Sequence, residues 1–183
     1  MKTHLQEKMV TLRDERGFTL IELVLTIIIV IILSVVVSLS LSSLSTTRLD
    51  QAVNKVVGDL RYAQQLAIST QSRYGMTVDS TAQYTIYRDA SPNPDVPVAD
   101  PSSLGQTLVV NFDTYRQGQL NGVRFGSATP FCGGAGGVME FNSLGAPTDT
   151  AGTVLACNSS VALSYSGNTH TITIQQNTGN LTY

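Results

Sequence analysis

The chain has few of the residue types on which catalysis and metal binding depend. Its 183 residues include only two histidines and two cysteines, and His4 lies near the start. Serine and threonine are abundant, but an activated nucleophile needs a base beside it, and no such pair is apparent. Cys132 and Cys157 have neither a second cysteine pair nor a neighbouring histidine, as a zinc site requires. We therefore expect no enzyme activity, no metal and no cofactor.

Positive charge is also scarce. The chain holds 11 Lys and Arg against 13 Asp and Glu, a formal net charge of −2, and no Lys or Arg follows Arg124. Residues 1–17 carry four of the basic residues and three of the acidic ones, so the remainder has a charge of −3. A general nucleic-acid binder needs a basic face that neutralises phosphates. This balance does not provide one.

One long stretch has no charge at all. No ionisable side chain lies between Glu22 and Arg48, and the stretch is mostly Leu, Ile and Val. Residues 18–44 are long enough to cross a bilayer as a helix. The basic residues before them predict a cytoplasmic N-terminus and a domain on the far side of the membrane. Glu22 in hydrocarbon costs a few kcal/mol, so it needs a partner, such as the amine of Phe18 freed by a cut after Gly17.

No proline precedes Pro92, so nothing interrupts this helix early. Beyond the uncharged stretch, apolar residues recur every three or four positions, which is typical of a helix with one buried side. They are Leu49, Val53, Val56, Leu60, Ala63 and Ala67. Asp50, Lys55, Asp59 and Gln64 fall largely off this stripe. We expect one helix from Phe18 to about Gln71, apolar all round over residues 18–44 and amphipathic over residues 45–72.

From Gly75 onward the apolar pattern alternates, which is typical of strands. Strands are expected at residues 76–78, 83–87, 107–112, 122–125, 138–141, 153–156, 161–165, 169–175 and 180–183, with a proline-rich loop over residues 91–103. The predicted class is α+β, with a long N-terminal helix packed on a mostly antiparallel sheet in a domain of residues 73–183.

The start of the apolar helix carries a specific motif. Residues 17–23, Gly-Phe-Thr-Leu-Ile-Glu-Leu, resemble the processing site of type IV prepilins and of type II secretion pseudopilins. The resemblance implies that a prepilin peptidase cuts between Gly17 and Phe18 and N-methylates Phe18. It also implies that Glu22 pairs with the Phe18 amine of a neighbouring subunit. The implied partners are other pilin or pseudopilin subunits, the peptidase, an inner-membrane assembly platform and, before assembly, the bilayer.

Three later segments resemble the GspH/FimT group of minor pilins and pseudopilins: residues 59–68, residues 140–147, and residues 171–174 with the turn at 177–179. The sequence differs from related pilins in two features that limit which kind of subunit it resembles. Leu39 stands where many major pilins have proline, which favours a minor subunit or a pseudopilin. No basic residue follows Gly179, whereas DNA-binding FimT pilins have arginines there.

The expected function is a structural minor subunit that primes or caps a pseudopilus for type II protein secretion. The precursor would be a single-pass inner-membrane protein with a periplasmic domain. Three alternatives stay open. One is a type IV pilus subunit for adhesion or motility, similar to mannose-sensitive-haemagglutinin pilins. The others are a DNA-uptake pilin and an anchored periplasmic domain that joins no filament.

Two features of the exported domain have open alternatives. In an oxidising periplasm Cys132 and Cys157 would form one disulfide, closing a loop of about 25 residues and adding roughly 3 kcal/mol; otherwise they are buried thiols. Asp89, Asp95 and Asp100 have oxygen ligands of the kind calcium prefers, but their spacing matches no known loop, so we expect them in solvent. His170 is expected on the surface.

Overall fold

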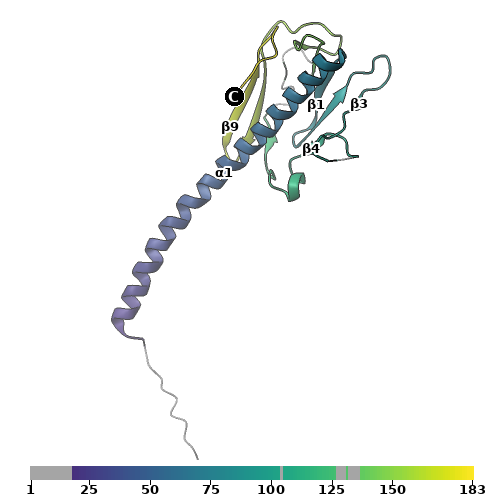
Figure 1. The fold of residues 1–183 in the computed structure, drawn as a ribbon. Coiled ribbons are helices and arrows are strands. Elements are labelled where there is room, and N and C mark those ends of the chain that lie inside the picture. Colours follow the sequence, from purple (N-terminus) through teal and green to yellow (C-terminus); the bar gives the residue numbers. More distant parts are fainter. Residues whose placement is uncertain (1–17, 104, 127–130, 132–136) are drawn as a thin grey trace, which may run out of the picture. The chain divides into compact units, whose positions relative to one another are not determined.

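The computed structural model describes residues 18–103, 105–126, 131 and 137–183, with the side chains of residues 35–45 left aside. The chain divides into two compact units, residues 1–41 and 42–183, which are taken separately below. One helix, α1 (Leu20–Thr70), extends through both (Figure 1). In the described part, no helix combines the length and the hydropathy needed to cross a membrane. The predicted crossing segment includes residues 35–44, whose side chains are not described, and it stays a prediction.

Helix α1 begins two residues later than the sequence pattern predicted, because Thr19 caps it. The Thr19 hydroxyl accepts the N–H of Glu22 at 3.3 Å, and the Thr19 carbonyl accepts the N–H of Leu23 at 3.2 Å. A threonine followed three positions later by a glutamate is the sequence pattern of a capping box. Glu22 also lies in the first turn, where a negative charge stabilises the helix dipole.

In the second unit, α1 buries one side. All six members of the predicted apolar stripe are buried, and Ala52 and Val57 widen it. The helix ends at Thr70, and Gln71 adopts a left-handed backbone with a φ of 53°. From residue 46 to its end, the described part of α1 therefore has one buried side and one exposed side. Asp59, expected off the stripe, is instead 8% exposed.

The strands form two antiparallel sheets. In the first, the order is β3-β2-β1-β6-β7, and β4 also pairs with β2. Its strands are β1 (Tyr74–Ser80), β2 (Gln83–Arg88), β3 (Val96–Pro97), β4 (Val109–Asn111), β6 (Val138–Phe141) and β7 (Pro147–Thr148). The second has the order β10-β9-β8-β5. Its strands are β5 (Arg124–Phe125), β8 (Ser159–Tyr165), β9 (Asn168–Ile174) and β10 (Leu181–Thr182).

This arrangement confirms the α+β class and changes some details. The strand predicted at residues 153–156 is reduced to one bridge, between Thr148 and Val154. β3 forms inside the loop that was predicted to be irregular. It is a two-residue edge strand paired with the end of β2, and edge positions tolerate proline because its missing N–H is not needed there.

The two sheets and α1 share one hydrophobic core. Tyr84 of β2, Phe112 after β4 and Phe125 of β5 form an aromatic cluster, with ring centroids 5.3 to 6.0 Å apart. Because Tyr84 belongs to the first sheet and Phe125 to the second, this cluster joins the sheets. The 3₁₀ turn η1 (Tyr115–Gln117) lies in the connection between them.

Candidate assembly site

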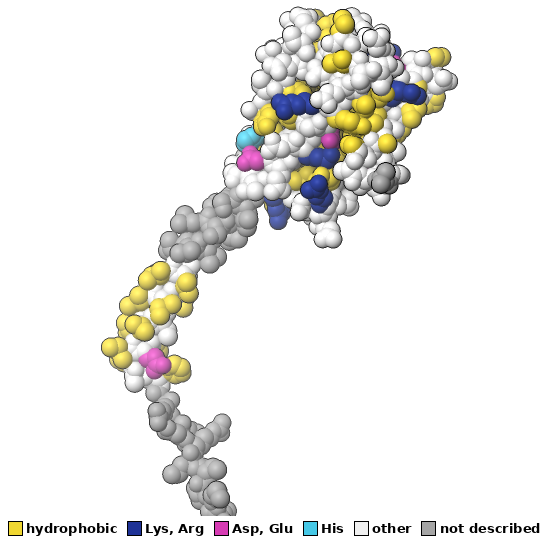
Figure 2. All heavy atoms as spheres, in the orientation of Figure 1, with side chains coloured by type: hydrophobic (Ala, Val, Ile, Leu, Met, Phe, Trp, Pro, Cys, Tyr) yellow, Lys and Arg dark blue, Asp and Glu magenta, His cyan; other side chains and the backbone are white. Residues whose placement is uncertain are grey.

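The first turns of α1 expose apolar side chains on every side. Phe18 is 79% exposed and Leu20 82%, and even Val24, the least exposed large apolar residue between Phe18 and Leu33, is 44% exposed. Figure 2 shows hydrophobic side chains covering this described segment. Bare apolar surface of this extent marks a region that lipid or other protein covers. A helix that is apolar all round has the same requirement.

Glu22 is the one charged side chain in the described part of this apolar segment. It is exposed, and it forms no ion pair with any described residue. Its backbone N–H is held by the Thr19 cap, which fixes the first turn from which the carboxylate projects. Gly17 lies outside the described residues, so the cut before Phe18 stays a prediction. Thr19 was missed as a functional residue, although its spacing to Glu22 is visible in the sequence.

On the domain side, a buried polar contact joins α1 to the first sheet. Lys55 Nζ lies 2.7 and 2.8 Å from the two carboxylate oxygens of Asp59, and the Tyr84 hydroxyl donates to Asp59 at 2.6 Å. Burial raises the pKa of Asp59, and the bonds from Lys55 and Tyr84 oppose that shift. Burial and the neighbouring carboxylate raise the pKa of Tyr84. This contact fixes the rotation of α1 over β2.

The three segments with the GspH/FimT resemblance meet at Gln64. Its amide nitrogen lies 2.8 Å from the carbonyl oxygen of Gly145 and 3.3 Å from those of Thr178 and Gly179. Gly145 and Gly179 both have positive φ, and a Cβ on Gly179 would lie 2.3 Å from the Gly145 oxygen. One helix side chain thus ties together two tight glycine turns. The resemblance marked these segments, but nothing in the sequence placed them side by side.

The acidic residues considered for calcium do not gather. Arg73 pairs with Asp89, and Asp100 accepts the N–H and hydroxyl of Ser102 at 2.8 and 2.7 Å. The structure, where it describes side chains, brings no three His, Cys, Asp or Glu residues into one metal-binding group. Arg73 also has its Nε 3.5 Å from Oε2 of buried Glu140. The other carboxylate oxygen of Glu140 accepts a hydrogen bond from the Tyr87 hydroxyl at 3.0 Å.

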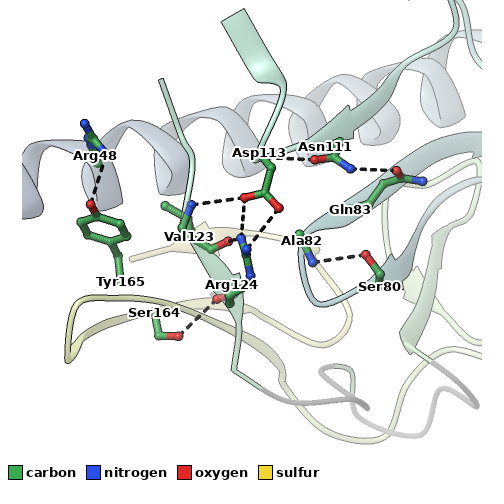
Figure 3. Close-up of polar contacts among 11 residues, drawn as sticks. Arg48, Ser80, Ala82, Gln83, Asn111, Asp113, Val123, Arg124, Ser164 and Tyr165 are labelled. Atoms are coloured by element: carbon green, nitrogen blue, oxygen red, sulfur yellow. Dashed lines mark hydrogen bonds and ion pairs between the residues drawn. The ribbon is translucent and has the colours of Figure 1, made fainter. Parts of the chain in front are cut away.

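A second polar contact joins β5 to the segment that follows β4 (Figure 3). Arg124 of β5 donates to both carboxylate oxygens of Asp113, at 2.8 and 3.1 Å, and the N–H of Gly122 donates to the same group. These bonds lower the pKa of Asp113. Arg48 of α1 donates a hydrogen bond to the hydroxyl of Tyr165 in β8 at 3.1 Å, as Figure 3 also shows.

Two predictions remain, one for the cysteines and one for His170. Cys132 lies outside the described residues, so its disulfide with Cys157 stays a prediction; Cys157 is exposed between β7 and β8. The His170 side chain is 45% exposed, with its Nε2 3.6 Å from an Asp50 oxygen. His170 therefore lies on the surface, as expected.

Comparisons with known proteins agree with this arrangement. A family model for the prokaryotic N-terminal methylation motif matches residues 12–43. Among solved structures, the chain resembles the minor pseudopilin EpsH from the Type 2 Secretion System of Vibrio cholerae. That match has a TM-score of 0.50 and 14% identity, over 74% of this chain and 94% of that chain. No curated protein matches the sequence.

The family model and the solved structure contribute different information. The matched motif contains Gly17, Phe18 and Glu22. At 14% identity, the EpsH similarity establishes the fold alone. Together, the motif and the fold support membership of the type IV pilin and pseudopilin superfamily, and with it a pilin or pseudopilin role.

Proposed function

We propose that the chain is a minor pseudopilin of the GspH/FimT type that primes or caps a periplasmic pseudopilus for type II protein secretion. The observation that carries this proposal is the apolar start of α1, exposed on all sides around Glu22 and lying inside the methylation motif. The fold it shares with a minor pseudopilin supports the same role. The role is structural.

In this proposal residues 1–17 are a cytoplasmic leader, residues 18–44 hold the precursor in the inner membrane, and residues 45–72 and 73–183 form the periplasmic part. A prepilin peptidase cuts after Gly17 and methylates Phe18. An assembly platform then moves the subunit from lipid into a bundle of similar helices. There the apolar side chains contact other pilin-type subunits, with little change in the polarity of their surroundings.

The charge pair supplies the direction and register of this transfer. Two opposite charges about 4 Å apart attract by about 4 kcal/mol at an effective dielectric constant of about 20. Pairing Glu22 with the Phe18 amine of a neighbouring subunit also removes two uncompensated charges from an apolar environment. Apolar helices alone can slide along one another, whereas this pair fixes their offset.

The experiment compares Glu22→Gln with the wild-type full chain in the cells that naturally make it. The glutamine keeps the size of the side chain and removes its charge. We expect processing to continue and the amount of subunit that sediments with sheared filaments to fall at least tenfold, since a loss of only about 1.4 kcal/mol already gives a factor of ten. A matched control is Asp50→Asn, an exposed acid on the same helix outside the apolar segment. Equal sedimentation of Glu22→Gln and wild type would contradict the proposed role of Glu22.

A second candidate is a minor subunit of a type IV pilus for adhesion or motility, because the motif is common to both systems. Deleting the gene distinguishes the two: lost secretion with intact surface pili supports the pseudopilin, and lost pili with intact secretion supports the pilus subunit. A DNA-uptake pilin is less favoured, since residues 125–183 contain no Lys or Arg and phosphate binding depends on such cations.

A further inference from the structure

A hollow of about 320 Å³ lies between α1 and the η1 turn. Besides Tyr115 and Leu120, its described lining consists of side-chain amides and cations, and none of these lining residues carries a carboxylate. The residues concerned are Gln51, Asn54, Lys55, Arg116 and Gln119. The chemistry of the lining suits an anion.

The two cations share one aromatic ring. Lys55 Nζ lies 5.6 Å and the Arg116 guanidinium 5.5 Å from the centroid of Tyr115. Asp59 neutralises Lys55 through its bonds at 2.7 and 2.8 Å. Arg116 is exposed and forms no ion pair with any of the described residues. Among the residues that line the hollow, Arg116 is therefore the cation without an ionic partner in the described part of the chain.

Asp100 is a candidate partner for Arg116 within the chain, since both line a neighbouring hollow. The Asp100 carboxylate accepts two bonds from Ser102 instead and makes no ion pair with Arg116. The guanidinium thus remains available to a group from outside the chain.

The backbone holds Arg116 in an unusual position. Three successive residues, Arg116, Gln117 and Gly118, have φ values of 43°, 62° and 85°. Two of them are not glycine, and a left-handed backbone at such residues persists only where the surroundings hold it and is frequent at sites that contact a ligand. Here the N–H groups of Gly118 and Gln119 both bond to the Tyr115 carbonyl, at 2.9 and 3.1 Å.

We propose that this hollow is the docking site for one carboxylate side chain of an adjacent pilin-type subunit. The inference rests on the proposed function, since it requires a neighbour in a filament. Arginine presents a planar donor fork that matches a carboxylate, and the amides of Gln51 and Gln119 add donors beside it. A nucleic acid or a phosphate-rich membrane needs a stripe of several uncompensated cations, whereas this hollow has one.

The test uses the full-length chain in the cells that naturally make it. A photo-crosslinking amino acid, benzoyl-phenylalanine, replaces Gln119 at the rim of the hollow, and mass spectrometry identifies the peptide it captures. In parallel, Arg116→Glu is compared with Arg116→Lys and with Arg61→Glu. Arg61 is an exposed cation on α1 outside the hollow, so the last variant makes the same charge change elsewhere.

We expect capture of a pilin-type subunit beside an Asp or Glu, and incorporation of Arg116→Glu into filaments reduced about fivefold or more. Arg61→Glu should incorporate nearly as wild type, and Arg116→Lys, which keeps the charge but loses the donor fork, should lie between wild type and Arg116→Glu. Replacing the captured acid by Lys should then restore Arg116→Glu. Capture of lipid, DNA or no partner, wild-type incorporation of Arg116→Glu, or failure of that rescue would overturn the inference. If the wild-type chain itself never enters filaments, the proposed function fails instead.

Discussion

At the scale of single residues, the Tyr84 hydroxyl is the clearest point to test. It donates to an Asp59 oxygen in a buried site, and removing a partner of a buried polar group costs about 1–3 kcal/mol. Tyr84→Phe should therefore lower the free energy of unfolding by that amount, measured by denaturant titration of the purified full chain. Tyr62→Phe is the matched control, because Tyr62 is half-buried and donates no hydrogen bond to the described residues. Equal losses in the two variants would mean that the Asp59 bond does not stabilise the fold.

Gly179 gives a second test, aimed at the meeting point of the three family-like segments. An added Cβ would lie 2.3 Å from the Gly145 oxygen and 2.4 Å from the Gln64 amide nitrogen. Gly167 has a similarly positive φ, with no atom within 4 Å of such a Cβ. Gly179→Ala should thus lower the melting temperature well beyond Gly167→Ala, since only the former adds a clash to the backbone strain. Equal melting temperatures for the two variants would mean that the turns at Gly145 and Gly179 do not approach each other closely.

The sequence indicates only part of these residue contacts. The pattern Thr19-x-x-Glu22 was available as a capping signal, and the resemblance marked Glu22 directly. Gln64 was assigned to the exposed side of the helix, and no local pattern connects it with glycines 81 and 115 positions away. Asp59 was likewise expected outside the stripe, because periodicity predicts apolar positions and is blind to a buried acid that has its own partners.

At the scale of elements, Gly58 is a weak point inside α1. It is exposed, and no atom lies within 4 Å of a Cβ built on it. Since glycine costs about 0.8–1 kcal/mol relative to alanine inside a helix, Gly58→Ala should stabilise the domain by up to that amount. Gly75→Ala in β1 is the contrasting variant, because its Cβ would lie 2.5 Å from the Met139 carbonyl oxygen. The melting temperature should rise for Gly58→Ala and fall for Gly75→Ala. A lower melting temperature for Gly58→Ala would contradict its placement at an exposed position inside α1.

The stability that the Arg124–Asp113 contact gives to the fold should depend on pH. Hydrogen bonds from Arg124 lower the pKa of Asp113, so the carboxylate stabilises the fold above the ordinary aspartate range near 3.8. That contribution disappears as the pH falls through the lower folded value. Wild type should exceed Asp113→Asn in melting temperature at neutral pH, and the gap should close in strong acid. A gap that stays constant with pH would show that the Asp113 charge plays no part.

How far elements follow from sequence depends on their length. The helix and the long strands have clear periodicity, and they were located within a few residues. β3, β5, β7 and β10 contain two residues each, too few to show a period, so the division into two sheets did not emerge. That division depends on pairing between distant segments, such as β5 with β8.

At the scale of the whole molecule, the proposed function requires the apolar start of α1 to move from one kind of surroundings to another. The apolar side chains at the start of α1 are exposed. In this proposal they are covered first by lipid and then by the helices of other subunits. In the same proposal, Glu22 favours the helix bundle over lipid, provided that the mature chain begins with a free amine at Phe18. Every later step, including the carboxylate docking at Arg116, requires that terminus.

The most direct measurement is therefore the N-terminal sequence and mass of the mature protein, purified from the cells that naturally make it and fragmented by tandem mass spectrometry. We expect a mature chain that begins at Phe18 and carries one methyl group on its amine. A chain that still begins at Met1, or one that begins at any residue after Glu22, would contradict it.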